Sequence, residues 1–179
     1  MLKLRPYKAC DALTITKWLK SEFAFRQWCA DRYDKYPITP DDMNEYYDKD
    51  KNNDNIWGMT AFNDTEIVGH FTMRYPSNNK NEIRLGFVIV DDSQRRKGYG
   101  KEMISLAIKY AFEFLKVNKV SLGVFENNIA ALNCYESCGF KKVMLDKTEC
   151  YECMGEIWNC IEMELKRQRK EFFYAVYYC

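Results

Sequence analysis

The chain contains 179 residues, of which 47% are hydrophobic and 30% are charged, and these values suit one domain with a sizeable core. Its 27 basic and 26 acidic residues nearly cancel, so the whole-chain charge gives no signature of nucleic-acid binding or of an anionic membrane surface. No apolar run is long enough to cross a bilayer, and the N-terminal segment lacks the hydrophobic core of a signal peptide, so we expect a cytoplasmic location.

The chain has eight cysteines, an even count that would allow disulfides in a secreted protein. Because no secretion signal is apparent, we expect reduced thiols instead. Cys150 and Cys153 have the spacing of a metal or redox pair, but there is no second such pair, and the single histidine, His70, lies far upstream. We therefore predict no metal site.

The N-terminal third is predicted to contain a short strand and two helices. Residues 3–6 form the strand, which stops at a proline, and residues 11–20 have the apolar spacing of a helix. Residues 21–38 are rich in aromatic side chains but weakly periodic, so they are predicted to be irregular. Thr39 as the N-cap and Pro40 at the first helical position predict that the second helix begins there.

The centre of the chain is predicted to alternate between strands and helices. Residues 56–62 and 66–74 form a hairpin, as the short polar segment between them indicates. Residues 83–90 read IRLGFVIV, a run typical of a strand buried on both faces. The remaining central elements are a helix up to residue 115, a buried strand over 120–125 and a short helix over 128–138.

The predicted fold class is α+β. Residues 141–145 and 156–165 are expected to form closing strands around a loop over residues 146–155. The element order is then β-α-α-β-β-β-α-β-α-β-β, with a mixed, mostly antiparallel central sheet and flanking helices. The two strands joined by the long helix are predicted to be parallel neighbours.

A glycine-containing turn joins the strand over residues 83–90 to the long helix. Gly98 and Gly100 are its only small residues. A turn of this kind presents backbone N–H groups at the positive end of the helix dipole, where phosphate binds. The flanking side chains that suit a multiply charged anion are Arg95, Arg96, Lys97 and Lys101. The sequence therefore predicts a cradle for a phosphorylated ligand.

The residues of this turn do not fit two common phosphate-binding motifs. A dinucleotide-binding turn requires a third glycine where Met103 stands. A P-loop requires serine or threonine after its lysine, but Glu102 follows Lys101. Neither a dinucleotide nor a P-loop nucleotide site is therefore expected.

What remains is the pattern Arg95-x-x-Gly98-x-Gly100. It closely resembles the Gln/Arg-x-x-Gly-x-Gly/Ala signature of the GNAT superfamily of N-acetyltransferases. The segment from Asn128 to Phe140 is similar to a second motif of that family, N-x-x-A-x-x-x-Y-x-x-x-G-F. The two motifs occur in the family's order, and a helix and a strand of fitting length separate them.

The resemblance implies a GNAT fold, with acetyl-CoA bound through its pyrophosphate at the glycine turn. It implies that the acetyl group passes to a primary amine by direct attack in a ternary complex. It also implies that the backbone of Ile89 and Val90 binds the pantetheine arm, where two parallel strands splay, and helps to polarise the thioester. The implied cofactor-binding residues are Ile89, Val90, Arg95, Arg96, Lys97, Gly98, Tyr99, Gly100, Lys101, Asn128 and Tyr135.

Two catalytic residues are expected. Tyr135 matches the family's tyrosine that faces the sulfur, which implies a hydrogen bond or a proton for the leaving thiolate. Many members carry a glutamate base where this chain has Arg84. Glu82 lies two residues earlier on the same face of the strand and is the predicted base, acting through water, with Glu126 and His70 as alternatives.

Three functions are open at this point: acetylation of a small-molecule amine, acetylation of a peptide N-terminus, and a CoA-binding module without turnover, which the missing glutamate motivates. The aromatic residues between positions 23 and 47 are expected either to wall the acceptor pocket or to form a small side core. We expect one GNAT domain over residues 1–166, with neither a nucleic acid nor a membrane as partner. The tail over residues 167–179 is expected to pack on its own domain or to form a homodimer contact.

Overall fold

The computed structural model describes residues 1–77, 80–146 and 148–168, so most of the predicted tail, residues 169–179, lies outside the described residues. Its centre is a mixed sheet with the strand order β1-β2-β3-β4-β5-β8-β6, in which β7 pairs with β8. The strands are β1 (Lys3–Pro6), β2 (Ile56–Phe62), β3 (Ile67–Arg74), β4 (Glu82–Val90), β5 (Lys119–Phe125), β6 (Lys141–Lys142), β7 (Glu149–Cys153) and β8 (Glu156–Lys166). Within the described ranges, no helix has the length and apolar character needed to span a membrane.

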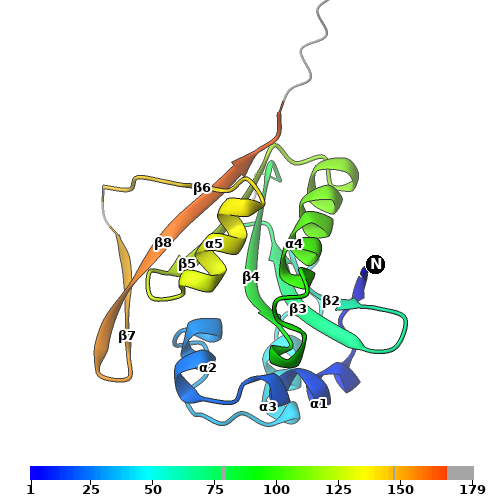
Figure 1. Cartoon of the computed structure of the whole chain (residues 1–179), viewed down its shortest axis with the longest axis vertical. Helices are drawn as coiled ribbons and strands as arrows, with labels where there is room; N and C mark the ends of the chain where they lie inside the picture. The colour runs from blue at the N-terminus through cyan, green and yellow to red at the C-terminus, as the bar shows by residue number, and fades with distance from the viewer. Residues whose placement is uncertain (78–79, 147, 169–179) are drawn as a thin grey trace, which may run out of the picture.

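The helices form two groups around the sheet (Figure 1). Their bounds are Ala12–Ile15 (α1), Glu22–Cys29 (α2), Pro40–Asp48 (α3), Tyr99–Lys109 (α4) and Ile129–Ser137 (α5), and α4 continues as a π-helical segment over Tyr110–Phe114. Helices α4 and α5 lie beside each other on the sheet, whereas α1, α2 and α3 gather near the end of β4 (Figure 1).

Each group of helices closes a core of its own. The main core lies between the sheet and α4 with α5, and it includes Leu85 of β4 and Met103 of α4, both almost completely buried. The second core lies among α1, α2 and α3 and includes Ile15, Phe25 and Met43, which are completely buried. The aromatic-rich segment therefore builds a side core, which is one of the two roles expected for it.

Several predicted features are confirmed. Strands β2 and β3 form the antiparallel hairpin, and β4 and β5, on either side of the long helix, are parallel neighbours. Thr39 caps α3 as predicted: its hydroxyl accepts a hydrogen bond from the Asp42 N–H at 3.1 Å, and the Asp42 carboxylate accepts one from the Thr39 N–H at 2.7 Å.

The segment predicted to be irregular contains α2. Ser21 caps this helix by accepting a hydrogen bond from the Ala24 N–H at 3.2 Å. The buried residues Phe25, Trp28 and Cys29 have the three- and four-residue spacing of a helix face, but other aromatic residues around them obscure that period in the sequence. Conversely, the helix predicted over residues 11–20 is only four residues of α-helix between two 3₁₀ turns.

Two predictions about strands were wrong. The expected loop over residues 146–155 contains β7, which forms a hairpin with β8 through Met154 and Gly155. Both turn residues have positive φ, 55° and 77°, and methionine at such a position gives no turn signal in the sequence. Strand β4 is not buried on both faces: Ile83 and Leu85 are buried, but the residues from 86 to 90 are only partly so.

The single histidine is part of the core. His70 is completely buried on β3, and its Nε2 lies 2.7 Å from the hydroxyl of Tyr47. Burial lowers the pKa of His70 to about 3, although the carboxylate of Asp11 opposes the shift. Because the unfolded chain, with an imidazole pKa near about 6.5, takes up the proton first, the stabilising contribution is fully present above that pH and is lost as the pH falls toward 3.

Replacing His70 by glutamine should weaken the dependence of stability on pH. His70→Gln keeps a hydrogen-bonding side chain but removes the titrating group. Between pH 6 and pH 5 the free energy of unfolding of the native protein should fall more steeply than that of the variant, by about 1.4 kcal/mol per pH unit. Urea unfolding at pH 7, 6 and 5 measures both slopes, and equal slopes would contradict a neutral buried imidazole.

Candidate active site

The two parallel strands at the centre of the sheet separate halfway along β4. Residues from Glu82 to Leu85 pair with β5, but within the described sheet residues 86–90 have no partner on that side, because β5 continues only with β8. On its other side β4 shifts register, so that Phe87 and Val88 both stand opposite Phe71 of β3. Phe87 has φ +48° in this bulge. The bulge therefore marks the start of a gap between β4 and β5.

Backbone groups of β4 face this gap. The Phe87 carbonyl accepts a hydrogen bond from the indole Nε1 of Trp28 on α2, at 2.8 Å. Asp91 donates its N–H to the Val68 carbonyl of β3 at 3.0 Å. Since the N–H groups of successive residues in a strand point in alternate directions, the Val90 N–H is turned away from β3, toward the gap. Of the two residues expected to contact a pantetheine arm through their backbone, Val90 has the donor on the correct side.

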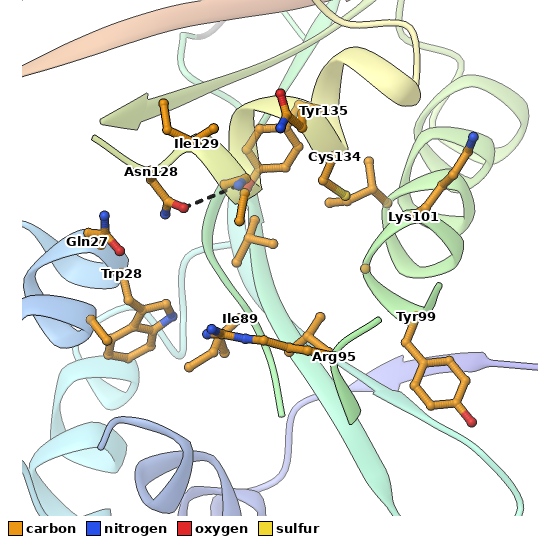
Figure 2. A pocket seen from close by; sticks show the side chains of 18 of the residues that line it. Gln27, Trp28, Ile89, Arg95, Tyr99, Lys101, Asn128, Ile129, Cys134 and Tyr135 are labelled. Atoms are coloured by element: carbon orange, nitrogen blue, oxygen red, sulfur yellow. Dashed lines mark hydrogen bonds between the residues drawn. The ribbon is translucent and has the colours of Figure 1, made fainter. Parts of the chain in front are cut away.

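A large cavity opens from the gap. It has a volume of about 860 Å³ and is walled by the end of β4, the glycine turn, α4, α5 and α2. Every predicted cofactor-binding residue except Lys97 lines it. Lys97 instead donates a hydrogen bond to the side-chain carbonyl of Gln94 at 2.7 Å. The fold thus brings together the end of one motif strand, the turn and the second motif helix, as Figure 2 shows.

The glycine turn leads directly into α4. Gly98 is the N-cap of α4 with φ +82°, and Arg96 also has a positive φ of 66°. The N–H groups of the first turn of a helix have no carbonyl partner within that helix, so they are available to an anion at this end of the cavity. Arg95, which forms a salt bridge with Asp92 at 2.5 Å, points into the cavity, whereas Tyr99 points away from it (Figure 2).

Helix α5 contributes Asn128 and Tyr135 to the opposite wall. The Asn128 side chain caps the helix by accepting a hydrogen bond from the Ala131 N–H at 3.2 Å, the dashed line in Figure 2. Tyr135 is only 6% exposed, and its ring packs edge-on against Phe140 with centroids 6.0 Å apart. Burial raises the pKa of Tyr135 above its usual value, so the phenol stays protonated at neutral pH.

The structure does not bring Glu82 to this cavity. It lies at the start of β4, and its eight-residue separation from Val90 corresponds to about 26 Å of strand. Its carboxylate forms a salt bridge with Lys119 at 2.8 Å and accepts a hydrogen bond from Ser121 at 2.5 Å. Burial opposes the charge, but these two partners lower the pKa of Glu82 overall. Glu82 is thus an ion-paired carboxylate at the end of β4 opposite to the cavity, too far away to act there as a base.

The alternative bases are also outside the cavity. Glu126 accepts a hydrogen bond from the Asn159 side chain at 3.0 Å, and His70 is buried in the core. Among the described residues that line the large cavity, none is aspartate, glutamate or histidine. A proton that leaves a reacting group here has no carboxylate or imidazole acceptor on the cavity wall.

A second, smaller cavity of about 310 Å³ lies beside the first. The two share Gln27 and Trp28 of α2 as a common wall. The smaller cavity is also lined by Phe87 of the bulge and by Tyr151 of β7. Two of its lining residues, Trp28 and Tyr46, belong to the aromatic residues that were expected either to wall an acceptor pocket or to form a side core. Sequence reasoning missed the rest of the lining, because those residues come from many elements without a common spacing. The helical spacing of Phe25, Trp28 and Cys29 was the one signal that could have placed part of its wall.

Known proteins share sequence segments with this chain. Spermine/spermidine N(1)-acetyltransferase of Bacillus subtilis (strain 168) is 35% identical over 68 residues, which are 37% of this chain and 45% of the relative. Acetyltransferase PseH of Campylobacter jejuni is 30% identical over 96 residues, which are 54% of this chain and 58% of the relative. The chain therefore spans about half the length of these curated relatives.

The fold recurs more completely than the sequence. The crystal structure of spermidine N-acetyltransferase from Vibrio cholerae in complex with CoA and spermine superposes with a TM-score of 0.78, over 92% of this chain and 95% of that one. At 20% identity this likeness shows the fold alone. The family model of the acetyltransferase (GNAT) domain matches residues 1–141, and the chain therefore belongs to the GNAT acetyltransferase family.

Proposed function

We propose that this protein is an N-acetyltransferase that moves the acetyl group of acetyl-CoA to a primary amine by direct attack in a ternary complex. The observation that carries the proposal is the gap between β4 and β5, where the large and the small cavity meet at Trp28. Membership of the GNAT family supports it. So do the names of two of the similar proteins, a spermine/spermidine N(1)-acetyltransferase and a spermidine N-acetyltransferase.

Acetyl-CoA would occupy the large cavity. Its pyrophosphate would bind at the N-terminus of α4, where Gly98 and the following residues present N–H groups and Arg95 and Arg96 supply positive charge. The pantetheine arm would pass along β4 and accept a hydrogen bond from the Val90 N–H. This placement brings the thioester into the gap, within reach of the smaller cavity.

Tyr135 would stabilise the departing thiolate. With ordinary pKa values of about 10 for a phenol and about 8.5 for a thiol, full proton transfer to the sulfur is uphill by roughly 2 kcal/mol. Burial raises the pKa of Tyr135 further and makes the transfer more unfavourable. We therefore assign Tyr135 a hydrogen bond to the developing thiolate rather than complete protonation.

The acceptor would enter as the neutral amine. Deprotonation of an amine with a lysine-like pKa of about 10.4 costs roughly 4.6 kcal/mol of free energy at pH 7. Among the described lining residues of both cavities, no carboxylate or imidazole is available to take that proton. Water would take it, either before the amine binds or through the open mouth of the cavity.

Release of the CoA thiol tests the activity. The purified protein, acetyl-CoA and a panel of primary amines should yield thiol above the rate of spontaneous hydrolysis for at least one amine. Binding of acetyl-CoA without thiol release for every amine would instead identify a CoA-binding module without turnover, and would overturn the proposal.

Gly98→Val should weaken acetyl-CoA binding at least tenfold. A Cβ at Gly98 would meet nothing within 4 Å, so the cost comes from the φ of +82°, which a β-branched residue adopts only with strain, rather than from crowding. Gly155→Val is the matched control, because Gly155 also has positive φ and open space but lies in the hairpin between β7 and β8. Isothermal titration should show native affinity for the control, and native affinity of Gly98→Val would refute the phosphate cradle.

Tyr135→Phe should lower kcat by at least about tenfold while the affinity for acetyl-CoA stays near the native value, because the phenyl ring keeps the packing and loses only the donor. The control is Tyr110→Phe, whose ring stacks on Phe114 in the π-helical segment beyond α4. Steady-state kinetics and titration measure the two quantities. Unchanged kcat in Tyr135→Phe would remove the leaving-group role.

A further inference from the structure

The smaller cavity has a charge that bears on the acceptor, and this inference rests on the proposed function. Three arginines line it: Arg32, Arg74 and Arg84. None of its described lining residues is aspartate, glutamate or histidine. A cavity of this kind suits an anionic group, because guanidinium groups form paired, charge-assisted hydrogen bonds with carboxylate and phosphate.

Two of the three arginines already have carboxylate partners. Both terminal nitrogens of Arg84 bond to Glu162 of β8, one of them at 2.8 Å. Arg32 pairs with the neighbouring Asp31, and its guanidinium lies 5.6 Å from the ring centroid of Tyr151. These two charges are therefore largely compensated within the fold, and they shape the wall more than they attract a ligand.

Arg74 differs from the other two arginines of this cavity. Among the described residues it has neither a salt bridge nor a hydrogen-bonded side-chain partner, and it stands directly opposite Arg84 in the register of β3 and β4. Like charges directly opposite each other on neighbouring strands are destabilising. Partial burial, Arg84 and Arg32 lower the pKa of Arg74, whereas the carboxylate of Glu162 raises it. Arg74 is exposed at the end of β3, so its guanidinium is open to a ligand, and an anion bound there would offset the repulsion from Arg84.

Small residues of neighbouring strands line the cavity beside the arginines. Thr72 and Gly86 stand opposite each other on β3 and β4. On β5 a Cβ at Gly123 would lie 2.9 Å from Nη2 of Arg84 and 2.8 Å from Sγ of Cys160. Glycine at position 123 is therefore required for the Arg84 guanidinium to lie across β5 and reach Glu162.

From this arrangement we infer that the acceptor is an amine that also carries a carboxylate or phosphate group, with Arg74 binding the anion and the amine directed to the gap beside Trp28. The positive cavity also favours the neutral form of the bound amine over its ammonium form. A polyamine would be a poor acceptor, because it would place several positive charges against guanidinium groups with no carboxylate on the wall to pair with them.

Matched amines test this specificity. Phosphoethanolamine is compared with ethanolamine, β-alanine with propylamine, and spermidine serves as the polycation, all by release of the CoA thiol at pH 8. At least one anionic amine should have a kcat/KM at least tenfold above that of its counterpart without the anionic group and above that of spermidine. The two pairs separate phosphate from carboxylate as the preferred group. A higher kcat/KM for spermidine than for both anionic amines would overturn the inference.

Arg74→Gln locates the anion site. The variant should raise KM for the preferred anionic amine at least tenfold, with kcat and the KM of the counterpart that lacks the anionic group close to native. Arg167→Gln, an exposed arginine that lines neither cavity, is the matched control and should behave as the native protein. An equal effect of Arg74→Gln on amines with and without the anionic group would mean that Arg74 supports the fold rather than the ligand, and would overturn the inference.

Titration of phosphoethanolamine and β-alanine into the CoA-bound protein separates this inference from the proposed function. In one outcome, either amine binds, the binding is lost in Arg74→Gln, and no amine yields thiol. The anion site then stands and the enzymatic proposal fails. If only amines without an anionic group yield thiol and neither anionic amine binds, then the enzymatic proposal stands and the anion site fails.

Discussion

The site depends on the loss of pairing between β4 and β5 after Leu85. A strand in the middle of a sheet normally satisfies its N–H and C=O groups on both sides, and leaving them unpaired in the interior is costly. Here the bulge at Phe87 opens the ladder, and the Trp28 indole satisfies the exposed Phe87 carbonyl at 2.8 Å. The Val90 N–H is left for a ligand. Both cavities exist because these two strands part, and α2 is the element that lies against the opening.

The features that could be predicted from the sequence are those encoded locally. The glycine turn, the Thr39 cap of α3 and the parallel pair around α4 follow from residue types and helical period over short stretches. Glu82 could not be placed in this way: it shares a strand with Val90, and only the register with β5 reveals that it lies at the opposite end, paired with Lys119. The smaller cavity was equally hidden, since Arg74 and Arg84 become neighbours only through the pairing of β3 with β4.

The arginine at position 84 has a different meaning in the structure than in the sequence. In the sequence it marks the absence of a glutamate base. In the structure it reaches over Gly123 to Glu162, so its charge is paired, and it stands opposite Arg74 beside the smaller cavity. The charge of Arg74, which has no such partner among the described residues, disfavours the ammonium form of an amine bound there. The same guanidinium then bears on both the protonation state of the acceptor and its anionic group.

Trp28 lies on the wall that separates the two cavities, and its indole nitrogen is held against the Phe87 carbonyl. Indole emission depends on the polarity and hydration around the ring, so this side chain is an optical probe built into the junction. Filling either cavity would change the surroundings of one side of the ring. In a variant whose other three tryptophans are replaced by phenylalanine, the fluorescence of Trp28 can therefore follow the order in which two ligands arrive, without any label added to the protein.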